Sequence, residues 1–195
     1  MTAKVRWVRV PTDDTETLVS LSRLLSWMLR HEPHTVGLVL DDAGWAEVDA
    51  VLSVCRDRGF VVDHAVLARV VETSDKRRFA LSDDGRRIRA VQGHSVPVSL
   101  GHPQRDPPPV LYHGTVDRFL DSIRREGLRP GQRHHVHLSA DPTTAVAVGA
   151  RRGVAVILTI RAAAMAEAGH QFFVSPNGVW LTEWVPPQFV EHPPA

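Results

Sequence analysis

The stretch GHPQRDPPP (residues 101–109) decides how the chain is organised, because it places four prolines within nine residues. Proline fixes φ and has no amide hydrogen, so this stretch cannot continue a helix or a central strand and favours an extended, stiff connector. We therefore expect one lobe over residues 1–100, a linker, and a second lobe over residues 110–195. The length of 195 residues is enough for two small lobes with buried cores.

The first half predicts helices followed by a β-hairpin. Leucines at helical spacing predict an amphipathic helix over residues 17–30, which Pro33 stops. Asp49 and Asp63 are each placed to cap a further helix. A short strand at residues 44–48 and two strand-like runs, RRFALS and RIRAVQG, joined by the turn Asp83-Asp84-Gly85, complete this half. The order is typical of a winged-helix-like lobe, a topology that often binds nucleic acid.

The second half predicts a mixed α+β sheet lobe. VAVILTI (residues 154–160) is an unbroken apolar run, typical of a buried central strand. Asp141 is placed to cap a helix whose first position is Pro142. Further strands are expected at VLYHGT, HHVHLS, QFFV and GVWLTEWV, and further helices at VDRFLDSIRREGL and AAAMAEAG.

Composition is that of a globular protein, with 43% hydrophobic and 23% charged residues and no apolar run long enough for a membrane span. The N-terminus lacks the apolar stretch of a secretory signal, so we expect a cytoplasmic protein. The single cysteine, Cys55, is expected to be a small core residue. A net charge of +1 gives no overall basic field, although basic residues gather over residues 76–89.

The residues that could carry chemistry do not form a common cofactor loop, since neither a Walker lysine loop nor a glycine-rich Rossmann fingerprint is present. Alternation would place His135 and His137 on one strand face, but no nearby cysteine or helical histidine pair completes a metal site, so we expect no metal. His113, followed by Gly114 and Thr115, could present an imidazole and backbone groups to a flat polar ligand. A strand that simply ends in a turn explains the same residues.

Five ordered blocks together resemble the KptA family of RNA 2′-phosphotransferases. They are LSWMLRHEPHTVGLVLDDAGWAEV, VETSDKRRFALSDDGRRIRAVQGHS, LYHGT, VHLSADPTTAVAVGARRG and NGVWLTEWVPPQF, which span residues 25–189. The resemblance implies an N-terminal winged-helix-like RNA lobe and a C-terminal lobe with the ADP-ribosyltransferase fold. It implies an enzyme that uses NAD as a co-substrate to remove an internal 2′-phosphate from RNA of the tRNA splice-junction type.

The resemblance also implies the catalytic residues Arg30, His31, Arg78 and Arg151, although Arg77 and Arg152 are adjacent alternatives for the last two. Planar guanidinium groups suit two phosphate-bearing substrates, because they bind oxygens bidentately. Under this interpretation the NAD contacts are His113, Gly114, Thr115, Arg133, His137 and Ser139. The contacts to the RNA backbone are Lys76, Arg77, Gln92, His94 and Ser95. The catalytic residues come from both halves, so we expect the site between the lobes.

Alternative functions remain open from sequence. An ADP-ribosyltransferase could transfer ADP-ribose to a nucleic-acid end or a protein without completing the second step. A noncatalytic RNA-binding winged-helix protein with a degenerate second lobe is the other alternative. Many ADP-ribosyltransferases use a glutamate on a late strand, where this sequence has the apolar Val179, and we interpret Glu183 as structural. We expect a monomer.

Overall fold

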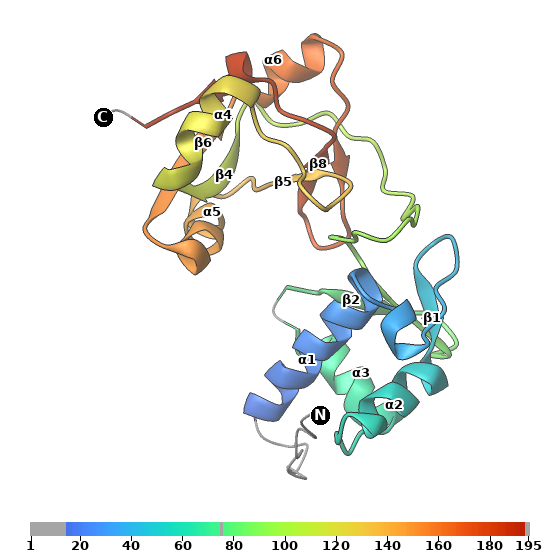
Figure 1. The fold of residues 1–195 in the computed structure, drawn as a ribbon. Coiled ribbons are helices and arrows are strands. Elements are labelled where there is room, and N and C mark those ends of the chain that lie inside the picture. The colour runs from blue at the N-terminus through green and yellow to red at the C-terminus, as the bar shows by residue number, and fades with distance from the viewer. Residues whose placement is uncertain (1–14, 75, 194–195) are drawn as a thin grey trace. The chain divides into compact units, whose positions relative to one another are not determined.

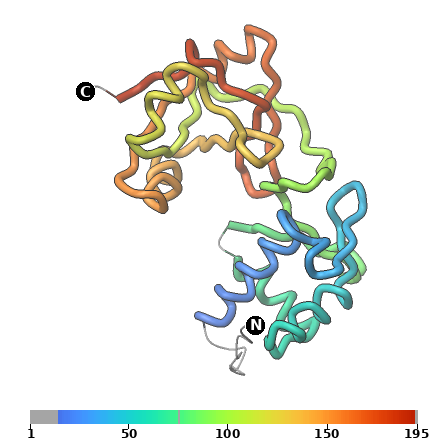
Figure 2. Tube along the Cα trace, in the orientation of Figure 1, coloured from blue at the N-terminus to red at the C-terminus, as the bar shows by residue number. Residues whose placement is uncertain are grey.

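The computed structural model describes residues 15–74 and 76–193. The chain divides into two compact units, Met1–Gly101 and His102–Ala195 (Figure 1). Figure 2 shows the same division along the Cα trace, with unit 1 in blue to green and unit 2 in green to red. Each unit combines helices with small antiparallel sheets, as the α+β interpretation predicts. The winged-helix and ADP-ribosyltransferase assignments stay predictions.

Unit 1 has three α-helices and one small sheet within its described residues. Its elements are α1 (Thr15–Arg30), the 3-10 helix η1 (His34–Val36), β1 (Trp45–Glu47), α2 (Val48–Asp57), α3 (His64–Glu72), β2 (Phe79–Leu81) and β3 (Arg87–Ala90). The strands are antiparallel in the order β1-β3-β2. Because side chains alternate along a strand, Phe79 and Ile88 face the helices and are buried.

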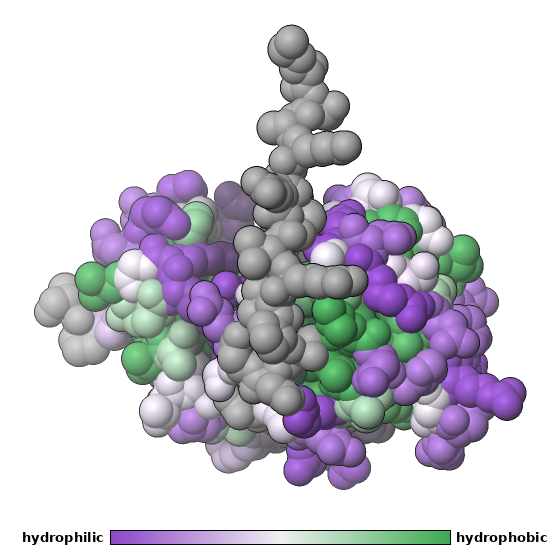
Figure 3. All heavy atoms as spheres, turned by 90° about the horizontal axis from the view of Figure 1, so that it is seen from below, coloured by the Kyte–Doolittle hydropathy of each residue, from purple (hydrophilic) through white to green (hydrophobic). Residues whose placement is uncertain are grey.

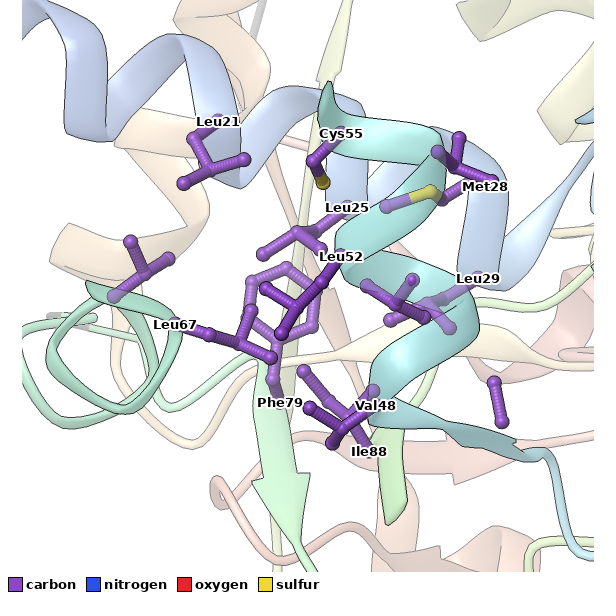
Figure 4. Close-up of a cluster of buried hydrophobic side chains, with 14 of the residues drawn as sticks. Leu21, Leu25, Met28, Leu29, Val48, Leu52, Cys55, Leu67, Phe79 and Ile88 are labelled. Atoms are coloured by element: carbon purple, nitrogen blue, oxygen red, sulfur yellow. The ribbon is translucent and has the colours of Figure 1, made fainter. Parts of the chain in front are cut away.

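The core of unit 1 lies between its helices and this sheet (Figure 4). Leu21, Leu25, Met28 and Leu29 form the buried stripe of α1, at the spacing that the sequence predicts. Cys55 lies in this core, which confirms the sequence expectation, and burial raises the pKa of its thiol to about 12.

Different contacts determine where α2 and α3 begin. Asp63 caps α3 as predicted, because its carboxylate accepts the Val66 N–H at 2.9 Å. The prediction that Asp49 caps α2 is wrong, since α2 begins at Val48 and Asp49 lies within the first turn. The Val48 N–H instead donates to the Arg86 carbonyl at 2.8 Å, so pairing beside the sheet sets where α2 begins.

Unit 2 contains two three-stranded antiparallel sheets, in the orders β4-β6-β9 and β5-β8-β7. Its strands are β4 (Leu111–Val116), β5 (Val136–Leu138), β6 (Ala155–Ile160), β7 (Phe173–Val174), β8 (Trp180–Thr182) and β9 (Val190–Glu191). Its α-helices are α4 (Leu120–Glu126), α5 (Pro142–Gly149) and α6 (Ala162–Glu167), and its 3-10 helices are η2 (Asp117–Phe119), η3 (Ala150–Arg152) and η4 (Pro187–Phe189). A bridge between Tyr112 and Ser139 links the two sheets.

Two predictions for unit 2 are confirmed and one needs correction. Asp141 caps α5 with Pro142 in its first turn, and β6 is the central strand of its sheet. The run at residues 154–160 is not buried throughout, because Val154 is 89% exposed whereas Leu158 and Ile160 are fully buried. Val154 precedes β6, and β9 pairs only with Thr159 and Ile160, so the start of this run lies beyond the sheet or has a paired strand on one side only.

The proline-rich segment takes part in the fold of unit 2. The Val174 N–H donates to the Pro103 carbonyl at 3.2 Å, and the Arg105 N–H donates to the Phe172 carbonyl at 2.9 Å. Gln104 forms an isolated antiparallel bridge with Phe173. Residues 103–105 therefore extend the open edge of β7, a role that composition does not reveal.

The surface is largely polar on the face that Figure 3 shows, where apolar side chains form separate patches among hydrophilic ones. Within residues 15–74 and 76–193, no helix combines the length and the apolar character that a membrane span requires.

Candidate functional site

In unit 1, polar side chains gather where α1 ends and the chain returns from the hairpin. Arg30 is the last residue of α1, and its guanidinium donates to the Arg78 carbonyl at 3.5 Å and lies 6.0 Å from the Phe79 ring centroid. The Arg30 carbonyl accepts the Ser95 N–H at 2.9 Å. Arg30, His31, Ser74, Arg78 and Ser95 are called the unit 1 cluster below. Three of the four predicted catalytic residues belong to it.

The His31 ring is held by Ser95. His31 Nδ1 lies 3.0 Å from Ser95 Oγ, which is also 3.4 Å from the Arg30 carbonyl. If the Ser95 hydroxyl donates to that carbonyl, His31 Nδ1–H donates to Ser95 and Nε2 is an acceptor. If the hydroxyl donates to Nδ1, Nε2 carries the proton. The imidazolium form donates from Nδ1 to Ser95 just as the Nδ1–H tautomer does, so His31 can gain or lose a proton at Nε2 while this contact stays in place.

Arg78 is fixed by contacts on both sides. Its carbonyl accepts from Arg30 and from the Val91 N–H at 3.0 Å. Its backbone N–H and its guanidinium Nη1 both donate to Ser74 Oγ, each at 3.3 Å. Arg78 is partly buried and immediately precedes β2. The structure thus holds the backbone of Arg78 against the Arg30 guanidinium and its side chain against Ser74, and the choice of Arg78 over the exposed Arg77 stays a prediction.

The five residues predicted to contact RNA lie in different surroundings. Lys76 and Arg77 are exposed, Gln92 is partly buried, and Ser95 contacts His31. His94 is only 2% exposed, and a side chain on Gly44 would meet its ring, so His94 is an interior residue of unit 1. Lys76, Arg77 and Gln92 are therefore better placed to reach a ligand than His94.

In unit 2, His113 on β4 is oriented by the neighbouring strand β5. Its Nδ1 lies 3.0 Å from the His137 carbonyl, and a carbonyl can only accept, so Nδ1 carries the proton and Nε2 is the acceptor. Burial lowers the pKa of His113, the His137 carbonyl opposes this, and the positive charge of Arg152 adds to the lowering. His113 therefore presents a neutral imidazole at neutral pH.

Arg133, Arg151 and Arg152 of unit 2 lie close enough to repel one another, and they are called the three-arginine cluster below. Burial lowers the pKa of Arg133, and the charges of Arg152 and Arg151 lower it further. Arg133 Nη1 is 3.2 Å from His137 Nδ1, so that imidazole nitrogen is the acceptor. Over residues 15–74 and 76–193, no ion pair with a carboxylate is observed for these three arginines. An anion would relieve their repulsion.

Gly114 permits close packing of α5 against β4, and its role as an NAD contact stays a prediction. A Cβ added at Gly114 would lie 1.8 Å from the Ala145 carbonyl oxygen and 2.9 Å from the Gly149 nitrogen. Gly149 is equally constrained, since its added Cβ would lie 2.9 Å from the Thr115 carbonyl oxygen. The two glycines let α5 lie directly on β4, which brings η3, with Arg151 and Arg152, beside His113.

Of the other predicted NAD contacts, Thr115 is buried and Ser139 is half-buried. The Thr115 side chain is 7% exposed. The Ser139 hydroxyl donates to the Asp141 carbonyl at 2.8 Å and accepts the Asp141 N–H at 3.1 Å, which forms the turn before α5. Ser139 therefore has a clear structural role in addition to its predicted one.

Sequence reasoning did not select Ser74, Gly149 or Arg152. A serine four residues before Arg78 is an unremarkable loop residue, and only the turn brings its hydroxyl back to the arginine. Arg152 was considered only as an alternative to Arg151. In the sequence, the glycine that follows, Gly153, is the signal of a sharp turn after the arginine pair. In the structure, Gly153 has φ +138.

The histidines around β5 have partners other than a metal. The His135 ring lies 5.9 Å from the Phe173 ring, and His137 contacts Arg133. Among the described residues, no group of three or more histidine, cysteine, aspartate or glutamate side chains is placed to hold a metal ion.

Comparison with known proteins identifies the family. The sequence profile of "RNA 2′-phosphotransferase, Tpt1 / KptA family" matches residues 16–184. A protein named "Probable RNA 2′-phosphotransferase" from Burkholderia lata is 58% identical over 172 residues, which are 88% of this chain and 89% of the relative. Proteins of the same name from Pseudomonas aeruginosa and Agrobacterium fabrum are 54% and 56% identical, over 91% and 85% of this chain and 98% and 89% of theirs. The chain belongs to the Tpt1/KptA family of RNA 2′-phosphotransferases.

Proposed function

We propose that this transferase uses NAD as a co-substrate to remove an internal 2′-phosphate from RNA, such as the phosphate at a tRNA splice junction. Family membership is the observation that carries the proposal. The two clusters support it chemically, because each presents guanidinium groups together with a histidine. We assign the RNA 2′-phosphate to the unit 1 cluster and the dinucleotide to the residues around His113.

The residues around His113 fit a dinucleotide. The three-arginine cluster matches the double negative charge of a pyrophosphate, which guanidinium groups bind through paired hydrogen bonds. His113 offers a neutral Nε2 acceptor, which suits a ribose hydroxyl or an amide N–H. Arg133, Arg151 and Arg152 would therefore hold phosphate oxygens, and His113 would orient the sugar or nicotinamide.

In the first step, an oxygen of the RNA 2′-phosphate attacks C1″ of the nicotinamide ribose. The glycosidic C–N bond breaks, and nicotinamide leaves with the bonding electron pair. A phosphate dianion is already nucleophilic, so the protein has to position it and offset its charge rather than remove a proton. Arg30 and Arg78 of the unit 1 cluster are assigned to this task, and Arg151 stays assigned to the dinucleotide phosphates.

In the second step, the ribose 2″-hydroxyl attacks the bridging phosphorus, and the bond from phosphorus to the RNA 2′-oxygen breaks. The hydroxyl loses a proton and the departing RNA oxygen gains one, giving 2′-hydroxyl RNA and ADP-ribose 1″,2″-cyclic phosphate. Histidine is the side chain that exchanges protons most readily near neutral pH. We assign one of these transfers to His31, whose contact with Ser95 suits it to both states.

The test is a short RNA with one internal 2′-phosphate, incubated with and without NAD, with a matched 2′-hydroxyl RNA as control. We expect loss of the phosphate only when NAD is present, with equal amounts of nicotinamide and 2′-hydroxyl RNA formed. Removal of the phosphate without NAD would refute the co-substrate assignment. Stable ADP-ribosylated RNA, without 2′-hydroxyl product, would favour an ADP-ribosyltransferase that stops after the first step.

A further inference from the structure

The turn before β2 has an unusual backbone conformation, and Ser74 accepts the hydrogen bonds that hold it. The Arg77 N–H donates to the Ser74 carbonyl at 2.8 Å, which closes the turn. Arg77 has φ +40, and within the described residues it is the one non-glycine residue with positive φ. Residues other than glycine, asparagine and aspartate rarely adopt this conformation. Such strain persists only where surrounding contacts impose it.

The contacts that impose this conformation converge on one oxygen. Ser74 Oγ accepts the Arg78 backbone N–H and the Arg78 guanidinium, both at 3.3 Å. A hydroxyl oxygen has two lone pairs, so these two bonds use its full accepting capacity and leave its own proton to donate elsewhere. Ser74 thus fixes where the chain enters β2 and the direction in which the Arg78 side chain points.

From this geometry we infer that Ser74 is a positioning residue, which aims the Arg78 guanidinium at the RNA phosphate. The inference rests on the function proposed above. An arginine loses considerable rotamer freedom when it binds an anion. A guanidinium that Ser74 already holds loses less rotamer freedom when the phosphate binds. This strengthens phosphate binding without adding a contact to the ligand.

The neighbouring hydroxyl provides a matched control. Thr73 directly precedes Ser74 as the C-cap of α3, and its hydroxyl donates to the Arg69 carbonyl at 2.7 Å. It forms no observed bond with Arg78 in the described part of the chain. Thr73→Ala therefore removes a hydroxyl one residue away from Ser74 but leaves the contact between Ser74 and Arg78 in place.

The experiment measures affinity and turnover. Without NAD, dissociation constants are compared for a short RNA with one internal 2′-phosphate and for its 2′-hydroxyl counterpart, and the ratio isolates the contribution of the phosphate. We expect Ser74→Ala to reduce this ratio, and kcat/KM with NAD present, by about 10- to 100-fold, the range for a binding group that is displaced. Ser74→Thr, which keeps the hydroxyl, should recover most of both. Thr73→Ala should stay within about twofold of the parent.

A second background shows whether Ser74 acts through Arg78. Lysine cannot reproduce the fork of the guanidinium, so Ser74→Ala should have little further effect on phosphate-dependent affinity in an Arg78→Lys protein. The inference is overturned if Ser74→Ala leaves the affinity ratio unchanged or if Thr73→Ala lowers the ratio as much. It is also overturned if Ser74→Ala lowers the ratio equally in the parent and in the Arg78→Lys protein.

The outcomes separate this inference from the proposed function. If the parent protein binds the phosphorylated RNA more tightly but shows no NAD-dependent turnover, the proposed function fails and the affinity ratios still decide the role of Ser74. If turnover occurs and Arg78→Lys lowers it while Ser74→Ala does not, only the role of Ser74 fails.

Discussion

Replacing Gly114 with alanine tests whether the spacing between α5 and β4 sets up the unit 2 site. The added Cβ would lie 1.8 Å from the Ala145 carbonyl oxygen, and real Cβ atoms essentially never approach closer than 3.0 Å. Because the obstacle is helix backbone, no side chain can rotate away. Strand and helix must separate by about 1.2 Å, the difference between these two distances.

The separation should lower both stability and activity. Overpacking of a core costs roughly 1–3 kcal/mol, and a clash between backbone atoms lies at the upper end, so we expect about 3 kcal/mol. For a unit of this size, that is a fall in Tm of roughly 10–20 °C. A displacement of about 1 Å of α5 would also move Arg151 and Arg152 relative to His113, with a loss in kcat/KM of about 100-fold.

The assays are thermal unfolding followed by circular dichroism, and the NAD-dependent reaction at a temperature where the variant is folded. Gly169→Ala is the control, because Gly169 has φ +91 and an added Cβ there meets nothing within 4 Å. It removes a glycine without a clash and should cost only about 1 kcal/mol. The reasoning is refuted if Gly114→Ala melts within a few degrees of the parent and keeps its kcat/KM.

Three further predictions concern His31, the histidines of unit 2 and the cap of α3. His31→Ala should accumulate the ADP-ribosylated RNA intermediate while nicotinamide release continues, as single-turnover analysis would show; slower nicotinamide release with no intermediate would contradict the second-step role. Burial lowers the pKa of His113 and His135 from the usual 6.5, so the unfolded chain binds more protons and unit 2 should lose stability as the pH falls below that value. Urea unfolding between about pH 7 and pH 5 should show this loss of stability, and the loss should be smaller in His113→Gln. If the free energy of unfolding falls with pH as steeply in that variant as in the parent, His113 is not its source. Asp63→Ala removes the bond to the Val66 N–H and should cost about 1 kcal/mol in urea unfolding, whereas Asp57→Ala, which changes an aspartate that is not a cap, should cost much less.

Local sequence predicted the helices where local chemistry sets them. Asp63 and Asp141 cap their helices because an aspartate carboxylate can reach the free N–H groups two or three residues ahead. Asp49 has the same chemistry but does not cap α2, because the Val48 N–H already pairs with Arg86, a residue distant in sequence. A cap prediction fails where a contact from elsewhere in the chain decides the first turn.

The helix expected over residues 116–128 shows a similar competition. Its apolar spacing is helical, yet Val116 completes β4, residues 117–119 form a 3-10 turn, and the α-helix covers only Leu120–Glu126. Val116 pairs with Ala155 across β4 and β6, so the sheet takes the residue that would begin the helix. Periodicity describes a face that can be buried, but pairing determines which residues remain available to form it.

The sequence by itself determined the family, because the ordered motifs match one family pattern. The resemblance also predicts Arg30, His31, Arg78 and Arg151 as the catalytic residues, which stays a prediction. The sequence also predicted an irregular segment over residues 101–109, since prolines disfavour the interior of helices and of central strands. Only the tertiary structure decided what holds these groups. Ser95 contacts His31 because the chain returns from the hairpin to the end of α1, and Ser74 contacts Arg78 because the turn before β2 brings its hydroxyl back to that arginine. Gly114 has to be a glycine because the backbone of Ala145, 31 residues further along the chain, lies where a side chain would be. Hydrogen bonds and steric contacts depend on distance in space, which local sequence patterns do not encode.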